Sequence, residues 1–327
     1  MALAPDSLGP TLAIGEILVE IVATTPGSGF RETQPLEGPF PSGAPAIFID
    51  QCARIGGASA LVGTVGDDDF GQLNTDRLKS DGVDISGIAI DPDLPTGSAF
   101  VRYRHDGARD YVFNLWTSAA GRIRRTDAVE AAIAGAGHLH VAGTLLARED
   151  LSELIEYAAT VIKGRGGSLS LDPNLRPELM AASGAGALFS RILRRCDLLL
   201  PSGDELQAVA GIAGGVAGEE QAISHLFEIG VPEIALKQGA GGATVFRPDH
   251  EPTRMPGFQV AEVDPTGAGD CFGGAYVACR RLGAGVGEAL TYATAAGARN
   301  VTVRGPMQGT GTRAELDAFI ARTPRHS

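Results

Sequence analysis

Lysine is scarce in this chain of 327 residues, where only three of the 27 basic side chains are lysines: Lys79, Lys163 and Lys237. The formal net charge is −12 and no run rich in lysine or arginine occurs, which argues against nucleic acid and anionic membranes as partners. No uncharged run reaches about 18 residues, the length that a membrane span needs, and no signal peptide is recognisable. We therefore expect a protein of the reduced cytoplasm.

Motifs of metal sites and of two common nucleotide-binding folds are also missing. The four cysteines show no metal-ligand spacing, and Cys52 and Cys271 lie in apolar helical patterns that place them in the core. No Gly-x-x-x-x-Gly-Lys-Ser/Thr occurs, which excludes a P-loop NTPase. No Gly-x-Gly-x-x-Gly follows a strand, which disfavours an NAD(P) enzyme.

Strands and helices alternate along most of the chain. Hydrophobic residues make up 44% and charged residues 20% of the sequence, the balance of a soluble globular protein. The pattern predicts strands at 11–15, 58–65, 138–142, 168–171, 197–200, 233–237 and 243–247, and helices at 46–55, 69–80, 148–163, 204–210, 219–229, 270–282, 286–302 and 313–321, with one more after residue 127 and a loop at 211–218. This alternation favours an α/β fold with a mostly parallel sheet covered on both faces.

Two segments, 16–30 and 96–115, break the alternation. In the second, apolar residues recur with period two on both sides of the turn His105-Asp106-Gly107 (Ala99, Val101 and Tyr103 before it, Tyr111, Phe113 and Leu115 after it). This pattern predicts a β-hairpin with one apolar face. The hairpin could cover a ligand site, or it could only cover a sheet edge.

The run at 263–272, Val-Asp-Pro-Thr-Gly-Ala-Gly-Asp-Cys-Phe, is the most informative stretch. It predicts a glycine turn followed by a helix, and helix-start amides with their positive dipole end bind anions. Asp270 places a carboxylate beside that anion position, which fits a base that takes a proton during phosphoryl transfer. The alternative is an ordinary N-cap aspartate after a glycine turn.

This run resembles the Asp-Thr-x-Gly-Ala-Gly-Asp signature of the ribokinase-like (PfkB) carbohydrate kinases, with Pro265 before Thr266 here. The resemblance covers nearly the whole chain. It implies a ribokinase-like three-layer sandwich with a mostly parallel central sheet and a small β lid. It also implies one kinase domain over 1–327, with lid strands near 16–40 and 96–116. In this family the last aspartate is the catalytic base and the preceding amides hold the transferring phosphoryl group, which assigns those roles to Asp270 and to Gly267, Ala268 and Gly269.

Three further segments match the family's nucleotide side. Lys237, Gly239 and Gly242 fit the Lys-x-Gly-x-x-Gly that lines the ATP site, and Asn174 and Arg176 fit the Asp-x-Asn-x-Arg between sugar and nucleotide phosphates. Ser202 and Glu205 fit Pro-Asn-x-x-Glu, with Ser202 in place of the asparagine and Glu205 as the Mg²⁺ residue. The residues alone also allow ordinary structural roles: a hairpin turn after Lys237, a strand-to-helix turn at 172–176, and an acidic Glu205 that complements the helix dipole in the first turn of a helix. The resemblance implies ATP and Mg²⁺, and it leaves a monovalent-cation requirement open.

The acceptor side departs from the family pattern. Ser42, Gly43 and Ala44 lie in a segment like the family's Gly-Gly-x-x-x-Asn, but Ile47 replaces the asparagine that hydrogen-bonds sugar hydroxyls. Glu16 matches an early acidic residue. Kinases of 2-keto-3-deoxygluconate carry Tyr-Tyr-Arg before Ser-Ala, where this chain has Phe113, Asn114 and Leu115, so the arginine that would hold a carboxylate is missing. Arg102 and Arg104 could replace it from the other hairpin strand.

These matches predict an ATP-dependent kinase that phosphorylates a primary hydroxyl of a ketohexose of the tagatose or fructose type. The first alternative is a 2-dehydro-3-deoxygluconate kinase. The second is a non-catalytic sugar or nucleotide sensor, which should have lost Asp270 or the glycines. A nucleoside kinase would need Asp near 20 and Asn near 47, and both are absent. The resemblance further implies a homodimer formed through the lid, and a lid would exclude water from the phosphoryl group.

Overall fold

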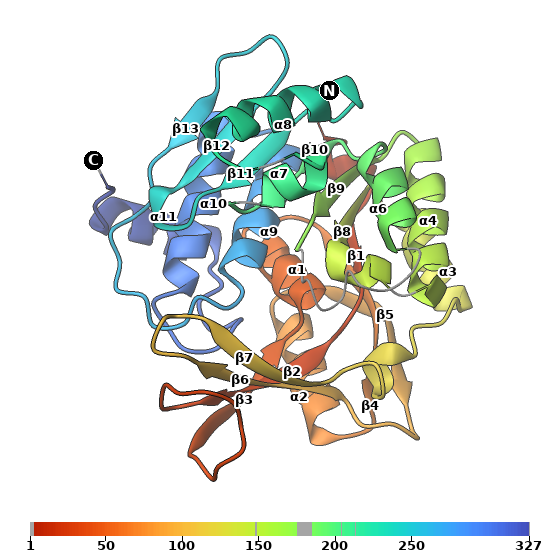
Figure 1. Cartoon of the computed structure of the whole chain (residues 1–327). Coiled ribbons are helices and arrows are strands. Elements are labelled where there is room, and N and C mark those ends of the chain that lie inside the picture. Colours follow the sequence, from red (N-terminus) through yellow and green to blue (C-terminus); the bar gives the residue numbers. More distant parts are fainter. Residues whose placement is uncertain (1–2, 148, 175–184, 204, 213, 327) are drawn as a thin grey trace.

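The computed structural model contains two β-sheets, of which the larger has nine strands in the order β13-β12-β11-β10-β9-β8-β1-β4-β5 (Figure 1). The structure describes residues 3–147, 149–174, 185–203, 205–212 and 214–326. The strands are β1 (Thr11–Ile14), β4 (Ser59–Gly66), β5 (Asp84–Asp91), β8 (His138–Ala142), β9 (Ser168–Asp172), β10 (Leu198–Leu199), β11 (Ile234–Lys237), β12 (Ala243–Phe246) and β13 (Thr253–Met255). Neighbours are parallel except where β12 pairs with β11 and β13. The predicted, mostly parallel sheet is therefore confirmed.

Helices cover both faces of this sheet and make a three-layer sandwich. One buried cluster joins the sheet to α1 (Ala44–Arg54), α2 (Asp69–Ser80), α9 (Ala268–Arg281), α10 (Val286–Asn300) and α11 (Arg313–Arg322). The other joins it to α3 (Asp127–Gly135), α4 (Glu149–Gly164), α6 (Ala185–Leu193), α7 (Glu205–Ala210) and α8 (Val216–Glu228). Short 3-10 helices cover Asp6–Leu8, Ala119–Gly121, Gly143–Ala147 and Gly239–Gly241.

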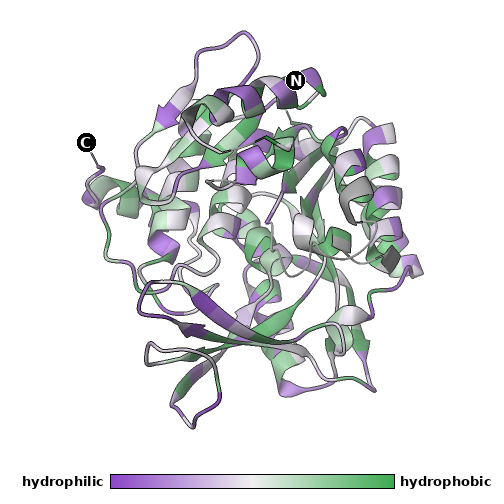
Figure 2. Cartoon of the chain, viewed as in Figure 1, coloured by the Kyte–Doolittle hydropathy of each residue, from purple (hydrophilic) through white to green (hydrophobic). Residues whose placement is uncertain are grey.

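The central strands are apolar because both of their faces are buried. Along β1, Ala13 belongs to one buried cluster while Leu12 and Ile14 belong to the other, as the alternation of a strand requires. Figure 2 shows these strands as hydrophobic, with hydrophilic residues on the outer parts of the helices around them. This burial fixes the positions at which the strands end, and those ends carry the site.

The second sheet has four strands in the order β3-β2-β6-β7 and is called the lid sheet below. Its strands are β2 (Leu18–Ala23), β3 (Leu36–Ser42), β6 (Gly97–Tyr103) and β7 (Arg109–Asn114). β2 pairs antiparallel with β3 and parallel with β6, and β6 and β7 form the predicted antiparallel hairpin. The lid sheet lies beneath the main body in Figure 1, so the two segments that break the alternation together form one small sheet.

Most predicted elements are confirmed, and the exceptions are two strands at sheet edges, one helix start and helix α6, which the sequence pattern does not predict. The sequence pattern does not predict β5 or β13. β5 is an edge strand with several exposed residues, so it has no continuous apolar run, and β13 has only three residues. Helix α8 begins at Val216, inside the stretch predicted as a loop.

The structure also bears on two further expectations, one about the cysteines and one about membrane-spanning segments. All four cysteines are free and buried, so the core positions predicted for Cys52 and Cys271 are confirmed. In the ranges that the structure describes, no helix is both long enough and apolar enough to span a bilayer.

Candidate active site

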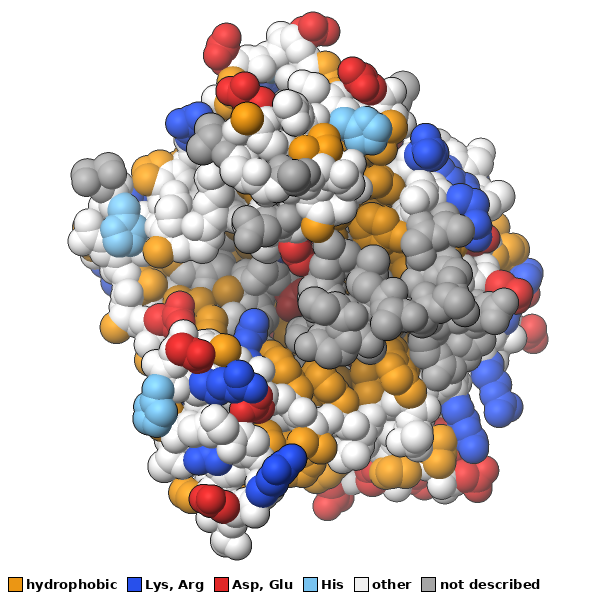
Figure 3. Space-filling view, in the orientation of Figure 1, with side chains coloured by type: hydrophobic (Ala, Val, Ile, Leu, Met, Phe, Trp, Pro, Cys, Tyr) orange, Lys and Arg blue, Asp and Glu red, His pale blue; other side chains and the backbone are white. Residues whose placement is uncertain are grey.

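A cavity of about 500 Å³, called the lid cavity below, lies where the lid sheet faces the carboxyl ends of central strands. Glu16 follows β1, Asp172 ends β9, Ser202 follows β10 and Lys237 ends β11, and all four side chains line it. Ligands of α/β sheets bind at these strand ends. Figure 3 shows the hollow, with acidic side chains inside it and hydrophobic side chains on the part of the lid sheet below it.

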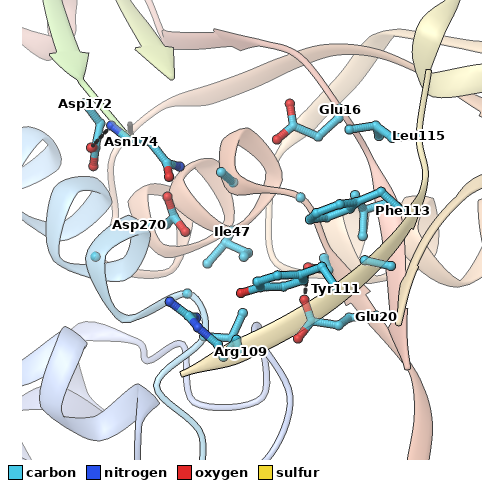
Figure 4. A pocket seen from close by; sticks show the side chains of 18 of the residues that line it. Glu16, Glu20, Ile47, Arg109, Tyr111, Phe113, Leu115, Asp172, Asn174 and Asp270 are labelled. Atoms are coloured by element: carbon cyan, nitrogen blue, oxygen red, sulfur yellow. Dashed lines mark hydrogen bonds between the residues drawn. The ribbon is translucent and has the colours of Figure 1, made fainter. Parts of the chain in front are cut away.

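Helix α9 begins at the boundary of the lid cavity. Its N-cap Gly267 has φ +80°, the left-handed region that favours glycine, and a Cβ there would lie 2.7 Å from the Pro306 carbonyl oxygen. The first amides of α9 have no partner within the helix, and the helix dipole gives them positive charge. Asp270 lies in the same first turn and lines the lid cavity between Asn174 and Ile47 (Figure 4). A carboxylate and an anion-binding backbone therefore meet here.

A buried ion pair lies beside this helix start. The Lys237 Nζ is 2.5 Å from the Asp172 Oδ2, and both residues are buried. Burial alone would lower the pKa of Lys237, but the charges of Asp172, Glu205 and Asp270 outweigh it and raise the pKa above its usual value. A Cβ on Gly269 would lie 3.3 Å from the Lys237 Nζ. The lysine therefore stays charged next to the α9 amides and adds to their attraction for an anion.

A second cavity of about 770 Å³, called the hairpin cavity below, lies on the other side of the α9 start. The turn between β11 and β12 and residues of α9 and α10 line it, among them Gly239, Ala240, Gly242, Ala268, Phe272, Gly297 and Ala298. Ser202, Lys237, Pro265 and Gly269 line both cavities. The two cavities therefore share the first turn of α9.

Glycine is required at position 242 by the chain's own fold. Gly242 has φ +96°, and a Cβ there would lie 2.0 Å from the Met255 carbonyl oxygen. A bulky residue at 242 would therefore distort the hairpin whether or not a ligand is bound. Gly239 also has a positive φ of +56° but faces open space.

Oxygen atoms that could bind a metal ion lie near the border of the two cavities. The Ser202 backbone N–H donates to the Glu205 Oε2 at 2.7 Å, and the Asn174 N–H donates to the Asp172 Oδ1 at 3.1 Å. Among the described residues, no group of three or more His, Cys, Asp or Glu side chains is arranged to hold a metal ion. Mg²⁺ normally keeps several waters and takes few protein carboxylates. The Glu205 carboxylate and the Ser202 hydroxyl fit such a sparsely coordinated ion.

The lid sheet supplies an aromatic wall to the lid cavity. The Tyr111 and Phe113 rings stack with centroids 4.9 Å apart, and the Arg109 guanidinium carbon lies 5.8 Å from the Tyr111 ring centroid. Ile47 and Leu115, the two apolar replacements noted in the sequence, also line this cavity. Figure 4 shows Arg109, Tyr111 and Phe113 side by side, opposite Asp270.

The remaining predicted acceptor residues lie on the same cavity. Glu16, Ser42, Gly43 and Ala44 all line it, and the Ser42 hydroxyl donates to the Glu20 Oε2 at 3.4 Å. Gly43 has φ +116°, and a Cβ there would lie 2.3 Å from the Glu16 carbonyl oxygen, which explains the glycine. The structure thus brings the 42–44 segment and Glu16 together with Asp270, as the resemblance implies.

The structure corrects the prediction for Arg102 and Arg104, since neither lines the lid cavity. Arg102 donates to the Gly29 carbonyl oxygen at 2.9 Å, and Arg104 forms an ion pair with Asp110. The physical reason is strand alternation. Residues 102 and 104 have the opposite parity from Val101 and Tyr103, so they point to the other face of the lid sheet.

Arg109 is the residue that the sequence reasoning missed. It pairs with Tyr103 across the hairpin and lines the lid cavity. The period-two pattern that places Tyr111 and Phe113 on the apolar face also places Arg109 there, two residues before Tyr111. Glu20 and Trp116 are further lining residues without a predicted role, and Arg176 lies outside the described residues.

Residues 12–313 of the sequence match the pfkB family carbohydrate kinase description. The chain belongs to this family. It is 32% identical to a 2-dehydro-3-deoxygluconokinase of Thermoproteus tenax, over 94% of this chain and 93% of that one. It is 30% identical to fructokinase-1 of Oryza sativa subsp. japonica, over 93% of this chain and 95% of that one. A solved structure of an E. coli protein provisionally named Ribokinase II, in complex with ATP and Mg²⁺, is 40% identical, with a TM-score of 0.88 over 96% of this chain and 99% of that one.

Family membership confirms the resemblance drawn from the 263–272 run, together with the ribokinase-like fold. It makes the chain a carbohydrate kinase by family. The relatives carry different acceptor names, a fructokinase and a keto-deoxy acid kinase, at nearly the same identity. The acceptor must therefore be argued from the lid cavity of this chain.

Proposed function

We propose that this pfkB-family protein transfers the γ-phosphoryl group of ATP to a primary hydroxyl of a neutral ketohexose such as fructose or tagatose, with Asp270 as the general base. The observation that carries this proposal is the first turn of α9, which borders both cavities and holds Asp270 beside the anion-binding amides. The E. coli structure with ATP and Mg²⁺ supports the donor, and the fructokinase relatives support the acceptor.

In this proposal ATP occupies the hairpin cavity, with its γ-phosphate at the Gly267, Ala268 and Gly269 amides and the Lys237 ammonium. The sugar occupies the lid cavity. Asp270 removes the proton of the primary hydroxyl, the hydroxyl oxygen forms a bond to the γ-phosphorus, and the bond from that phosphorus to the β,γ-bridging oxygen breaks to release ADP. Glu205 and Ser202 would place Mg²⁺, which supplies neutralising charge to the phosphates when bound. The lid sheet keeps water from replacing the sugar.

The lining of the lid cavity favours a neutral acceptor. Ile47 and Leu115 are apolar where relatives of the keto-deoxy acid type would offer polar contacts, and the carboxylates of Glu16 and Glu20 also face the cavity. Fixed negative charge disfavours a second carboxylate nearby. One observation favours the keto-deoxy acid as a second candidate. Arg109 lines the cavity, and within the described part of the chain its guanidinium group forms no ion pair, so it could bind a carboxylate of the acceptor.

An acceptor panel tests this choice. We expect fructose or tagatose to exceed 2-keto-3-deoxygluconate in kcat/KM by about tenfold or more, the effect of one well-matched polar contact. ATP-coupled assays in potassium and in sodium buffer measure the ratio. Arg109→Gln should leave the preference for the ketohexose in place, and Arg104→Gln is the matched control because its partner Asp110 lies outside the cavity. A keto-deoxy acid that is the better substrate, and whose use Arg109→Gln abolishes, would establish the second candidate instead.

We also propose that two chains associate through their lid sheets. β7 is an edge strand of the lid sheet, and Val112 and Phe113 on it are 45% and 46% exposed. Edge strands with exposed apolar side chains pair readily with another chain. Sedimentation velocity should give a dimer at micromolar concentration, and Val112→Lys should shift it toward the monomer. A monomer across that concentration range would contradict the proposal.

A further inference from the structure

The hydroxyl group of Tyr103 connects the lid sheet to the loop that leads into α9. Tyr103 is the last residue of β6, and its hydroxyl donates to the Asp264 Oδ1 and lies 2.8 Å from the Thr266 Oγ1. Thr266 directly precedes Gly267, the N-cap of α9. One phenol therefore spans from the lid sheet to the backbone that forms the anion site, across 161 residues of sequence to Asp264.

Asp264 is held in place from the body side as well. It is only 1% exposed, its Oδ1 also accepts from the Thr266 N–H at 3.0 Å, and its Oδ2 accepts from the Gly305 N–H at 3.0 Å. The Asn300 Nδ2 donates to the Thr266 carbonyl oxygen at 2.8 Å. The loop is therefore fixed to the body independently of the lid, and Tyr103 adds the lid to a network that is already ordered.

The proton in this network has a defined position. Burial, and then the charge of Asp264, raise the pKa of Tyr103 well above its ordinary value. Tyr103 therefore keeps its proton near neutral pH and donates a hydrogen bond to the Asp264 carboxylate. Its oxygen is then left to accept from the Thr266 hydroxyl, so both contacts are satisfied at once. Hydrogen bonds to an ionised group are the stronger kind.

A second contact also joins the lid to this region, but it is exposed. The Arg304 guanidinium lies 2.7 Å from the Glu37 carboxylate, with the two side chains 32% and 49% exposed. Solvent-exposed ion pairs contribute little because water competes for both partners. The partly buried contact of Tyr103 with the buried Asp264 is therefore the one suited to hold the lid sheet against the α9 loop.

We propose that Tyr103 is a positioning residue that fixes the lid sheet to the 264–267 loop and so aligns the acceptor with Asp270 and the α9 amides. Tyr103 is not among the residues that line either cavity, so it acts through Asp264 and Thr266. Its kinetic consequence rests on the proposed kinase function. The contact itself does not, and it can be tested separately.

Tyr103→Phe removes only the hydroxyl group. We expect kcat to fall by about 10- to 100-fold, the effect of losing a hydrogen bond to a charged group. The KM for ATP should change by less than about twofold, because the hairpin cavity keeps all of its residues. Trp116, the only tryptophan of the chain, lines the lid cavity, so its fluorescence gives acceptor affinity without turnover.

Thr266→Val should also lower kcat, and adding it to Tyr103→Phe should lower kcat by less than the product of the two separate losses.

Tyr292→Phe and Glu37→Gln are the matched controls. Tyr292 donates to Asp317 at 2.5 Å on an exposed surface, so its loss is the same chemical change elsewhere. Glu37→Gln removes the exposed contact between lid and body. Both should keep near-wild-type kcat. If Tyr103→Phe also keeps wild-type kcat, or if it lowers only the melting temperature, the positioning role is overturned.

Hydrogen exchange tests the contact without any reaction. In Tyr103→Phe, amides of strand β6 and of the 264–270 segment should exchange faster together, whereas in Tyr292→Phe neither segment should change. Unchanged exchange in Tyr103→Phe would overturn the proposed contact even if the enzyme is a kinase. Faster exchange in a protein that phosphorylates no acceptor would instead leave the contact standing and overturn the proposed function.

Discussion

Replacing Asp270 with Asn is expected to lower kcat by about 10²–10⁴-fold, the usual contribution of a general base. The amide has nearly the size of the carboxylate but cannot accept the proton of the attacking hydroxyl. ATP should still bind, because Lys237, the α9 amides and the hairpin cavity are unchanged. Steady-state kinetics and calorimetric titration with ATP measure the two quantities.

Asp249→Asn is the matched control for that variant, since Asp249 is exposed in the turn between β12 and β13 and lines neither cavity. It should keep wild-type kcat. An Asp270→Asn protein that also keeps near-wild-type kcat would show that Asp270 serves only as a helix-start acid, the alternative reading of this motif.

Replacing Lys237 with Met is expected to lower the free energy of unfolding by about 3–5 kcal/mol, the cost of leaving one partner of a buried ion pair without its counter-charge. Asp172, which is 5% exposed, would remain as the unpaired charge. Activity should be lost as well, because the ammonium beside the Gly269 position is removed. Denaturant titration at neutral pH measures the free energy.

Two further variants separate burial from charge. Lys163→Met breaks the 2.7 Å ion pair between Lys163 and Asp197, in which the lysine side chain is 31% exposed. The loss of unfolding free energy in this variant should therefore be clearly smaller. Lys237→Met combined with Asp172→Asn leaves neither charge buried alone and should recover part of the stability, though no activity. Equal losses for Lys237→Met and Lys163→Met would be inconsistent with the buried position of the Lys237 pair.

The residues of the 263–272 run could be placed from sequence because their geometry is local. A glycine turn and a helix start follow one another within this run, and each has a recognisable residue pattern. Asp172, Ser202 and Lys237 converge for a reason that is nearly as general, since the carboxyl ends of neighbouring parallel strands meet at one edge of a sheet.

The acceptor side could not be placed in the same way, because it depends on the pairing register of the lid sheet. The register pairs Ala99 with Phe113 and Tyr103 with Arg109, which selects Arg109 over Arg102 and Arg104. The alternation of residues 99, 101 and 103 already contains this information once the face toward the cavity is known. The contact between Tyr103 and Asp264 has no local pattern at all, since it joins the lid sheet to a loop that lies 161 residues further along the chain.

The chemical form of the product tests the central claim most directly. The protein would be incubated with ATP, Mg²⁺ and fructose or tagatose, and the product analysed by proton-coupled phosphorus NMR. The account predicts an Asp270-dependent phosphate ester whose signal is split by the two protons of one CH₂ group, as a primary hydroxyl requires. A signal split by a single proton, or no ester with either sugar, would contradict it.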